Sequence, residues 1–281
     1  MIDLHTHSSA SDGSLTPSQL MDEAAHRGLS AIALTDHDTI DGLAEASTAA
    51  QKWGIQLIPG IEIEIRWEPG EFHLLGLGLG HPHASFLASI AELSRLREKR
   101  NREILDRMHA LSIQADYEDI RALSGGHLVG RPHFATFLVN RGLVKNREQA
   151  FFRYLGKGKP LYVPKEGLEF EKALDLIKQV GGIAVLAHPM SLYVAWGHLP
   201  GLIKNLRDRG LDGIEAWHPT AKVRSCKRLE ELGTSLGLYI TAGSDFHGAS
   251  RPDRKLGITA GDRKIEEAIL EAIPVLAPGC G

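Results

Sequence analysis

Residues 31–38, with the sequence AIALTDHD, decide the fold prediction. The apolar run 31–34 is typical of a short buried strand, and the polar residues 36–38 follow at its C-terminal end. A capped helix is predicted before it, ending at Gly28, and a second helix is predicted after it, over about 40–53. A strand between two helices indicates a parallel sheet or barrel, because each parallel crossover needs a covering helix.

The same alternation extends outward from this stretch. A strand is predicted before it at 2–5 and another after it at 55–59. Two further strands, 61–67 and 72–79, form a hairpin that turns at Pro69-Gly70. Residues 84–156 have a helical pattern throughout. Strands then return at 183–187, 213–216 and 239–242, with helices near 169–180 and 222–236. We therefore predict one α/β domain with an inserted helical domain, in three segments: 1–83 (first part of the barrel), 84–162 (helical insertion) and 163–281 (second part of the barrel).

Composition argues against a duplex-binding, disulfide-rich, secreted or membrane-spanning protein. The 281 residues are 43% hydrophobic and 24% charged, which is ordinary for a globular protein. A net charge of −3 gives no general attraction to nucleic acid or to an anionic membrane, so stable duplex binding is not expected. Cys226 and Cys280 lie far apart and suggest no disulfide framework. The N-terminus does not resemble a signal peptide, and no apolar run approaches the roughly 20 residues of a membrane-spanning helix. We expect a cytoplasmic protein.

Histidines and acids recur where predicted strands end. In a parallel barrel these ends meet on one face, where catalytic residues gather. The pairs His5-x-His7 and Asp245-x-His247 each direct two side chains to one side, because side chains alternate along extended chain. Mixed imidazole and carboxylate ligands suit Zn, Mn or Fe. A set this large indicates a centre with several metals, whereas isolated histidines such as His81 and His198 are expected to be surface residues.

The motifs at these positions resemble those of the PHP (polymerase and histidinol phosphatase) family. In chain order they are Asp3-Leu4-His5-Thr6-His7-Ser8, Ser11-Asp12-Gly13, Thr35-Asp36-His37-Asp38, Gly60-Ile61-Glu62, Ala187-His188-Pro189 and Gly243-Ser244-Asp245-Phe246-His247. The resemblance implies a distorted (β/α)7 barrel with two or three divalent metal ions, manganese first and iron or zinc as alternatives. It assigns His5, His7 and Asp245 to the first metal, with Glu62 as the bridge to the second. His73 and His188 complete the second site. Asp12, His37 and His247 form the third.

A narrower resemblance concerns substrate. Gly130-Arg131-Pro132-His133, Tyr162-Val163-Pro164 and the stretch 213–219 resemble the stand-alone branch of nucleoside 3′,5′-bisphosphate phosphatases and 5′-exonuclease-like proteins. This implies hydrolysis of a nucleoside 3′,5′-bisphosphate to a nucleoside 5′-monophosphate and phosphate, by attack of a hydroxide that bridges two metals. Short 5′-phosphorylated oligonucleotides are a further expected substrate. The alternatives are another phosphoesterase of this family, such as a histidinol-phosphate phosphatase or a phosphodiesterase, and a non-catalytic module stabilised by metal.

Residues with expected roles in catalysis or substrate binding complete the prediction. Glu62, Asp245 and His218 are the expected catalytic residues. Asp3, Asp36 and Asp38 are candidates for orienting the imidazoles. The basic run 95–102 is either a solvated helix face with pairs such as Glu98–Arg102 or a wall of the active site. The expected substrate-binding residues are Asp12, His37, Lys99, Arg100, Asn101, Arg131, His133, Lys165 and His218.

Overall fold

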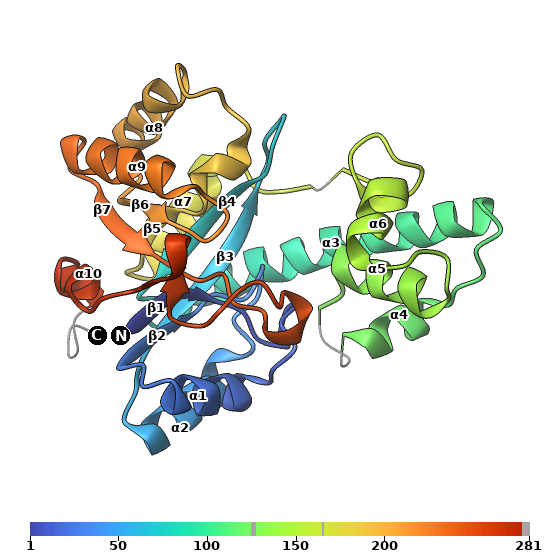
Figure 1. Cartoon of the computed structure of the whole chain (residues 1–281), viewed down its shortest axis with the longest axis horizontal. Coiled ribbons are helices and arrows are strands. Elements are labelled where there is room, and N and C mark those ends of the chain that lie inside the picture. Colours follow the sequence, from blue (N-terminus) through green and yellow to red (C-terminus); the bar gives the residue numbers. More distant parts are fainter. Residues whose placement is uncertain (125–127, 165, 277–281) are drawn as a thin grey trace.

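Seven strands form one sheet in chain order, and the sheet curls into a nearly closed barrel (Figure 1). The computed structural model describes residues 1–124, 128–164 and 166–276. The strands are β1 (Ile2–Thr6), β2 (Ala31–Leu34), β3 (Gln56–Ile65), β4 (Phe72–Leu77), β5 (Ile183–Leu186), β6 (Gly213–Trp217) and β7 (Tyr239–Ala242). The segment after β7 returns to β1, where the amide of Asp245 donates to the carbonyl of His5 over 2.9 Å. This contact brings the first and last strands together.

Strand β4 is antiparallel to both neighbours, and the other neighbouring strands are parallel. One strand prediction was wrong: the predicted strands 55–59 and 61–67 are the single strand β3. This strand changes partner at Gly60, because residues 56–59 pair with β2 and residues 60–65 pair with β4. A sequence pattern shows the proline and glycine in the middle of the strand but not the change of partner.

Helices cover the outside of the barrel. The predicted capping box of α1 is confirmed, since the Thr16 hydroxyl accepts from the amide of Gln19 and the Gln19 side chain accepts from the amide of Thr16. The second helix begins three residues later than predicted, at Leu43. The helices are α1 (Pro17–His26), α2 (Leu43–Trp53), α7 (Phe170–Gln179), α8 (Leu199–Asp208), α9 (Val223–Ser235) and α10 (Ala268–Glu271). The short elements after β5 and β7 are η2 (Pro189–Leu192) and η3 (Gly248–Ser250), and a small hairpin follows, β8 (Ile258–Thr259) and β9 (Arg263–Lys264).

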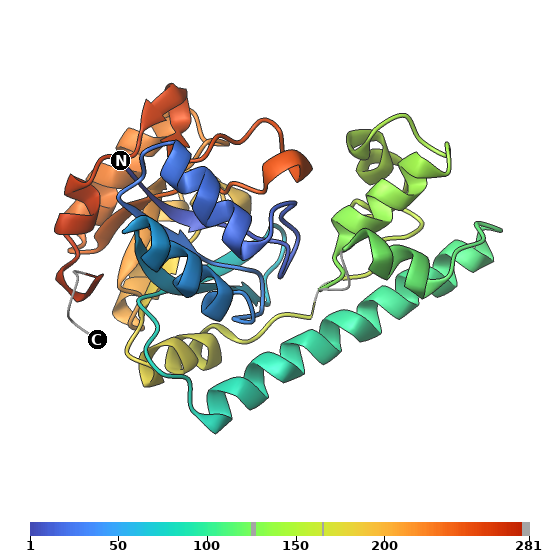
Figure 2. The ribbon, with the colours of Figure 1, turned by 90° about the horizontal axis from the view of Figure 1, so that it is seen from below.

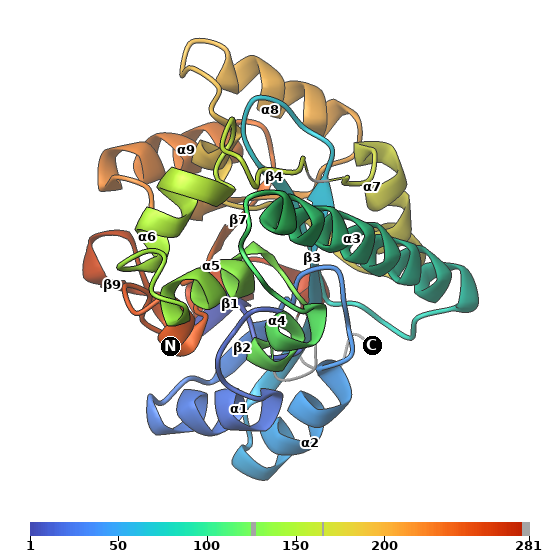
Figure 3. The same ribbon diagram turned by 90° about the vertical axis from the view of Figure 1, so that its right-hand side faces the viewer.

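The helical insertion has an apolar core of its own. Its long helix α3 (Ala84–Ala110) has 27 residues, or about 40 Å of helix. Phe86 and Ile90 near its start pack into the barrel core, whereas Ile104 and Met108 belong to a separate cluster. The other helices of the insertion are α4 (Tyr117–Leu123), α5 (Arg131–Asn140), α6 (Arg147–Ala150) and the π-helix η1 (Phe151–Leu155). Figure 2 shows α3 extending away from the barrel, and Figure 3 shows the insertion in front of the barrel strands.

The structure bears on two further expectations. Cys226 is buried and free, and Cys280 lies outside the described residues. None of the helices in the described ranges combines the length and the apolar character needed to cross a membrane.

Candidate metal centre

The structure brings the nine expected ligands together at one end of the barrel. His37, His188 and His247 follow parallel strands, so they lie where the carboxyl ends of those strands meet. His73 lies near the beginning of β4, and because β4 runs in the opposite direction, its beginning is at the same end. Among the described residues, these side chains form overlapping groups of three or four, each of which could hold one metal ion, and the donor atoms of a group lie within 4.8 Å of one another. Together the groups contain His5, His7, Asp12, His37, Glu62, His73, His188, Asp245 and His247.

Glu62 is at the centre of this cluster. It lies within β3, beyond Pro59, the last residue that pairs with β2. One of its oxygens, Oε1, is 2.8 Å from His73 Nδ1 and 3.0 Å from His188 Nε2. The other, Oε2, is 2.8 Å from His37 Nδ1. Its side chain is only 1% exposed, and burial opposes ionisation, yet the surrounding imidazoles hold the pKa of Glu62 well below its ordinary value. Each oxygen therefore faces different nitrogens, as in a carboxylate that bridges two cations.

Two further groups of donors flank Glu62. His5 Nε2 and His7 Nε2 are 3.1 Å apart, and Asp245 Oδ1 lies 3.7 and 3.5 Å from them. On the other side, Asp12 Oδ1 lies 3.1 Å from His247 Nε2 and 3.9 Å from His37 Nε2. Burial, together with the nearby His247, lowers the pKa of His7 to about 3, so this imidazole is neutral and its nitrogen lone pair can bind a metal.

Hydrogen bonds fix which nitrogen of each imidazole faces the cluster. His5 Nδ1 donates to Glu215 Oε1 over 2.9 Å, because an ionised carboxylate can only accept. This leaves the lone pair of Nε2 directed at Glu62 and Asp245. His247 Nδ1 likewise donates to the carbonyl of Asp245 over 2.8 Å, which leaves Nε2 facing Asp12. Both rings therefore turn a lone pair towards a carboxylate oxygen.

The second pair of imidazoles is fixed in the same way. His73 lies between two carboxylates, with Nε2 3.0 Å from Glu64 Oε2 and Nδ1 2.8 Å from Glu62 Oε1; the tautomer that donates to Glu64 presents the lone pair of Nδ1 to Glu62. His188 Nδ1 is 2.8 Å from the Ser191 hydroxyl, which gives its own proton to the carbonyl of Glu71 and so accepts from the ring. His188 Nε2 therefore turns its lone pair towards Glu62.

These donors fit divalent metals. Lone pairs that face carboxylate oxygens attract a cation between them, and the mixture of nitrogen and oxygen donors suits Mn, Fe or Zn. Several buried atoms of the cluster have no hydrogen-bond partner, among them Asp12 Oδ1, Glu62 Oε2 and His247 Nε2. Buried polar atoms are normally paired, so these atoms point to bound ions.

A glycine lets β1 and β7 approach closely enough to build the cluster. A Cβ atom at Gly243 would overlap the Cβ of His5 and lie 2.6 Å from Glu215 Oε1. Only a residue without a side chain fits between the ligand His5 and the carboxylate that orients it. Close packing against His5 and Glu215 thus explains why the motif 243–247 begins with a glycine.

The expectation that Asp3, Asp36 and Asp38 orient the imidazoles was wrong. Asp3 accepts from the backbone amides of Ser244 and Gly257, Asp36 binds Ser8 and Ser11, and Asp38 pairs with Arg97. They hold loops in place. The carboxylates that orient imidazoles are Glu215 and Glu64. Both could have been found in the sequence, because Glu64 shares a strand face with Glu62 and Glu215 is a charge inside an apolar strand.

A cavity of about 310 Å³ opens beside the cluster. Its lining includes Glu62, His188 and Asp245, together with His218. The backbone amide of Thr220 donates to His218 Nδ1, so the proton of the neutral ring is on Nε2, which lies 3.4 Å from Asp245 Oδ2. Arg251 also lines the cavity, and its Nη1 is 3.2 Å from the same Asp245 oxygen. Nothing in the motif pattern identified Arg251.

One cation of the insertion, Arg131, contacts the lining of this cavity, and Arg100 is close enough to Arg131 to feel its charge. Arg131 is 14% exposed and pairs over 2.9 Å with Glu71, a residue of the cavity lining. Arg100 is buried, and burial together with the nearby Arg97 and Arg131 lowers its pKa to about 9. His133 is buried too, and its Nδ1 accepts from the amide of Gly130, so Nε2 carries the proton of the neutral ring. Lys165 lies outside the described residues.

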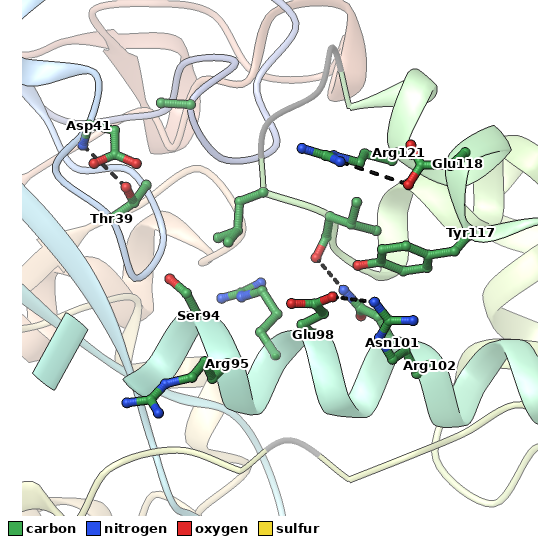
Figure 4. Close-up of a pocket in the computed structure, with 14 residues that line it drawn as sticks. Thr39, Asp41, Ser94, Arg95, Glu98, Asn101, Arg102, Tyr117, Glu118 and Arg121 are labelled. Carbon is green, nitrogen blue, oxygen red and sulfur yellow. Dashed lines mark hydrogen bonds and ion pairs between the residues drawn. The ribbon is translucent and has the colours of Figure 1, made fainter. Parts of the chain in front are cut away.

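Other residues of the basic run face a second cleft, of about 490 Å³, between the insertion and the loops of the barrel (Figure 4). Asn101 donates to the carbonyl of Val129 across it. Lys99 is mostly exposed and pairs with Glu166. The arginines of this cleft are already paired, Arg95 with Glu92, Arg97 with Asp38, Arg102 with Glu98 and Arg121 with Glu118. The predicted Glu98–Arg102 pair is present.

Comparisons with known proteins agree with this geometry. A model of the PHP domain matches residues 3–162. The chain is 39% identical to a 5′-3′ exoribonuclease of Haemophilus influenzae, over 87% of this chain and 89% of that protein. It is 34% identical to a 3′,5′-nucleoside bisphosphate phosphatase of Chromobacterium violaceum, over 92% of this chain and 91% of that protein. The solved structure of an amidohydrolase from C. violaceum, with bound sulfate and no metal, covers 100% of this chain and 99% of its own, at 32% identity and a TM-score of 0.85.

Proposed function

Since the chain belongs to the PHP domain family and is a metal-dependent phosphoric ester hydrolase, we propose that it removes the 3′-phosphate of nucleoside 3′,5′-bisphosphates. The observation that carries this proposal is the position of Arg131. It is held by Glu71 at the rim of the cavity whose floor is Glu62 and the surrounding histidines. A substrate with two phosphates could therefore place one at the metal centre and the other at the guanidinium.

We assign the nine donors to two or three divalent ions, with manganese as the proposed metal. His5, His7 and Asp245 would hold the first ion, His73 and His188 the second, and Asp12, His37 and His247 the third, and Glu62 would contribute to the first two sites. When bound, such ions lower the pKa of coordinated water and neutralise charge on phosphoryl oxygens. Glu215 and Glu64 keep His5 and His73 oriented for binding.

His218 is the proposed acid for the leaving oxygen. Its protonated Nε2 lines the cavity and has no hydrogen-bond partner, while Nδ1 is occupied by Thr220. When the ring carries both protons, Nδ1 can donate to the Thr220 hydroxyl, 2.6 Å away, and Nε2 can pass its proton to the departing alkoxide, which leaves a neutral ring. Arg251, beside Asp245, is suited to neutralise charge on the phosphoryl group.

The second phosphate is assigned to the cations of the insertion. Arg131 offers a planar pair of donors that matches a phosphate, and exchanging Glu71 for phosphate keeps its charge paired. His133 can add a hydrogen bond from Nε2. Arg100 raises the positive potential behind them, because little solvent screens a buried charge. We propose that the segment 84–162 caps the barrel end and supplies this selectivity.

Arg131→Ala tests the substrate assignment. We expect kcat/KM for adenosine 3′,5′-bisphosphate to fall about ten- to hundredfold, because a charge-assisted hydrogen bond contributes about 1.5–3 kcal/mol. Hydrolysis of adenosine 3′-monophosphate, which lacks the second phosphate, should change less than about twofold. Arg141→Ala, at an exposed arginine paired with Asp119, is the matched control. Equal effects on the two substrates would contradict the assignment.

His218→Asn tests the proposed acid. We expect unchanged metal content and a kcat lower by about a hundredfold on the bisphosphate. The loss should be smaller on nitrophenyl phosphate, whose leaving group needs little protonation. His81→Asn, at an exposed histidine outside the site, is the control. Equal losses on both substrates would assign His218 to holding phosphate, and lost metal would make it a ligand.

Short 5′-phosphorylated oligonucleotides are a second candidate substrate class. The observation in favour is the cleft of about 490 Å³ beside the loops that carry Asp12 and His37, which offers a path for a longer chain. Release of phosphate from the bisphosphate and from histidinol phosphate, and of nucleoside 5′-monophosphate from such oligonucleotides, measured side by side with Mn²⁺, separates the candidates. The bisphosphate should have the highest kcat/KM.

A further inference from the structure

The turn after β5 places an aromatic residue, Tyr193, at the mouth of the metal cavity. Tyr193 lines this cavity together with His188 and His218, yet its side chain is 74% exposed. Exposure alone is not informative, because Phe152 on the insertion is 72% exposed and does not line the cavity. The position of Tyr193 sets it apart: its ring is next to the site where the substrate binds.

The turn that carries Tyr193 is firmly attached to its surroundings. The amide of Ser191 donates to the carbonyl of His188, and the amide of Glu71 donates to the carbonyl of Ser191 over 2.8 Å. The indole of Trp67 donates to the carbonyl of Leu192, whose side chain is buried. The residues just before Tyr193 are thus fixed to the β3–β4 hairpin and to the proposed ligand His188.

The backbone of Tyr193 is left-handed, with φ 53° and ψ 33°. Residues with a Cβ atom disfavour this region, because the Cβ approaches the following carbonyl. Such strain persists only where the surroundings impose it, and it clusters at functional sites. His188, at the start of the same turn, also has a positive φ, of 26°. The attached turn therefore fixes the backbone from which the exposed Tyr193 ring extends.

We propose that Tyr193 is the platform on which the nucleobase of the substrate stacks. The inference rests on the proposed function, since it assumes a nucleotide. The donors lie at the buried floor of the cavity, so a nucleotide whose phosphate reaches them leaves its base towards the mouth, where Tyr193 is. An aromatic ring stacks on any base, because every base has a π face. The ring has few rotatable bonds, so little conformational entropy is lost on stacking.

The test measures binding, separately from turnover. Calorimetry on the Mn²⁺-loaded protein gives the Kd of adenosine 5′-monophosphate and that of ribose 5-phosphate, which lacks the base. Tyr193→Ala should raise the Kd of the nucleotide about tenfold and leave that of the sugar phosphate unchanged. Tyr193→Phe keeps the ring and should bind both as the wild type does. Phe152→Ala, which removes an equally exposed ring elsewhere, should also bind both normally.

Three results would overturn the inference. They are an unchanged nucleotide Kd in Tyr193→Ala, an equal rise for both ligands, and a loss in Tyr193→Phe as large as in Tyr193→Ala, which would assign the role to the hydroxyl. Failure of the proposed function would show elsewhere, as absence of phosphate release from adenosine 3′,5′-bisphosphate by the wild type. The two Kd values would still decide whether Tyr193 stacks on a base.

Discussion

Glu62→Gln is expected to lower kcat/KM by about a thousandfold or more, because both carboxylate oxygens face imidazole nitrogens at about 3 Å. The amide has nearly the same shape, so the fold should persist. It lacks the charge, however, and its nitrogen presents hydrogens where an oxygen is needed. Phosphate release, elemental analysis and a thermal melt measure the three consequences: lost activity, reduced metal content and a retained cooperative transition.

Glu98→Gln is the matched control for this variant. Glu98 is half-exposed on α3, where its partner is Arg102, and its loss should change kcat/KM by less than about twofold. If Glu62→Gln kept kcat/KM within tenfold of the wild type, Glu62 would not be a bridge between metals. The assignment of the other donors to separate ions would then need revision.

Removal of metal is expected to abolish phosphate release and to lower the melting temperature. Protein expressed with added Mn²⁺ should contain more than one equivalent of metal. Each ion stabilises the folded state by about 4 kcal/mol at a thousandfold excess over its Kd. For a chain of this size, the combined loss corresponds to a shift on the order of 10 °C.

Restored activity after adding Mn²⁺ to chelator-treated protein would show that the loss is specific to metal. Fe²⁺ and Zn²⁺, added in parallel, would rank the metals. Less than one equivalent of metal after supplemented expression would contradict a centre with several ions. An unchanged melting temperature would show that the donors contribute nothing to stability through bound ions.

Local patterns predicted a parallel sheet or barrel and the convergence of histidines and acids at its strand ends, and the resemblance to the PHP family added the seven-stranded barrel and the set of nine donors. A short apolar run predicts a strand, and a polar motif directly after it falls at the shared end of the barrel. The pair His5 and His7, for example, was identified from its own spacing, without reference to residues far away in the sequence. The site could be predicted wherever a motif of histidines and carboxylates directly follows a predicted strand.

The interactions between distant residues could not be predicted in this way. The partner of Arg97 is Asp38, 59 positions away, and only the packing of α3 on the barrel brings them together. Glu215 can be recognised in the sequence as a charge inside an apolar strand, but its partner His5, 210 positions away, cannot. The two residues before Tyr193, Ser191 and Leu192, are held by Glu71 and Trp67 of another hairpin. Each case depends on tertiary packing, which overrides local preference.

The closing contact between the first and last strands has a consequence for biosynthesis. Asp245 and His247 leave the ribosome about 240 residues later than His5. At about 5–20 residues per second, this interval lasts on the order of 12–50 s. During that time the early histidines are accessible without their final partners. The first and third sites, which include Asp245 and His247, can therefore be completed only after β7 has been made, so a chain that ends before β7 lacks the complete centre.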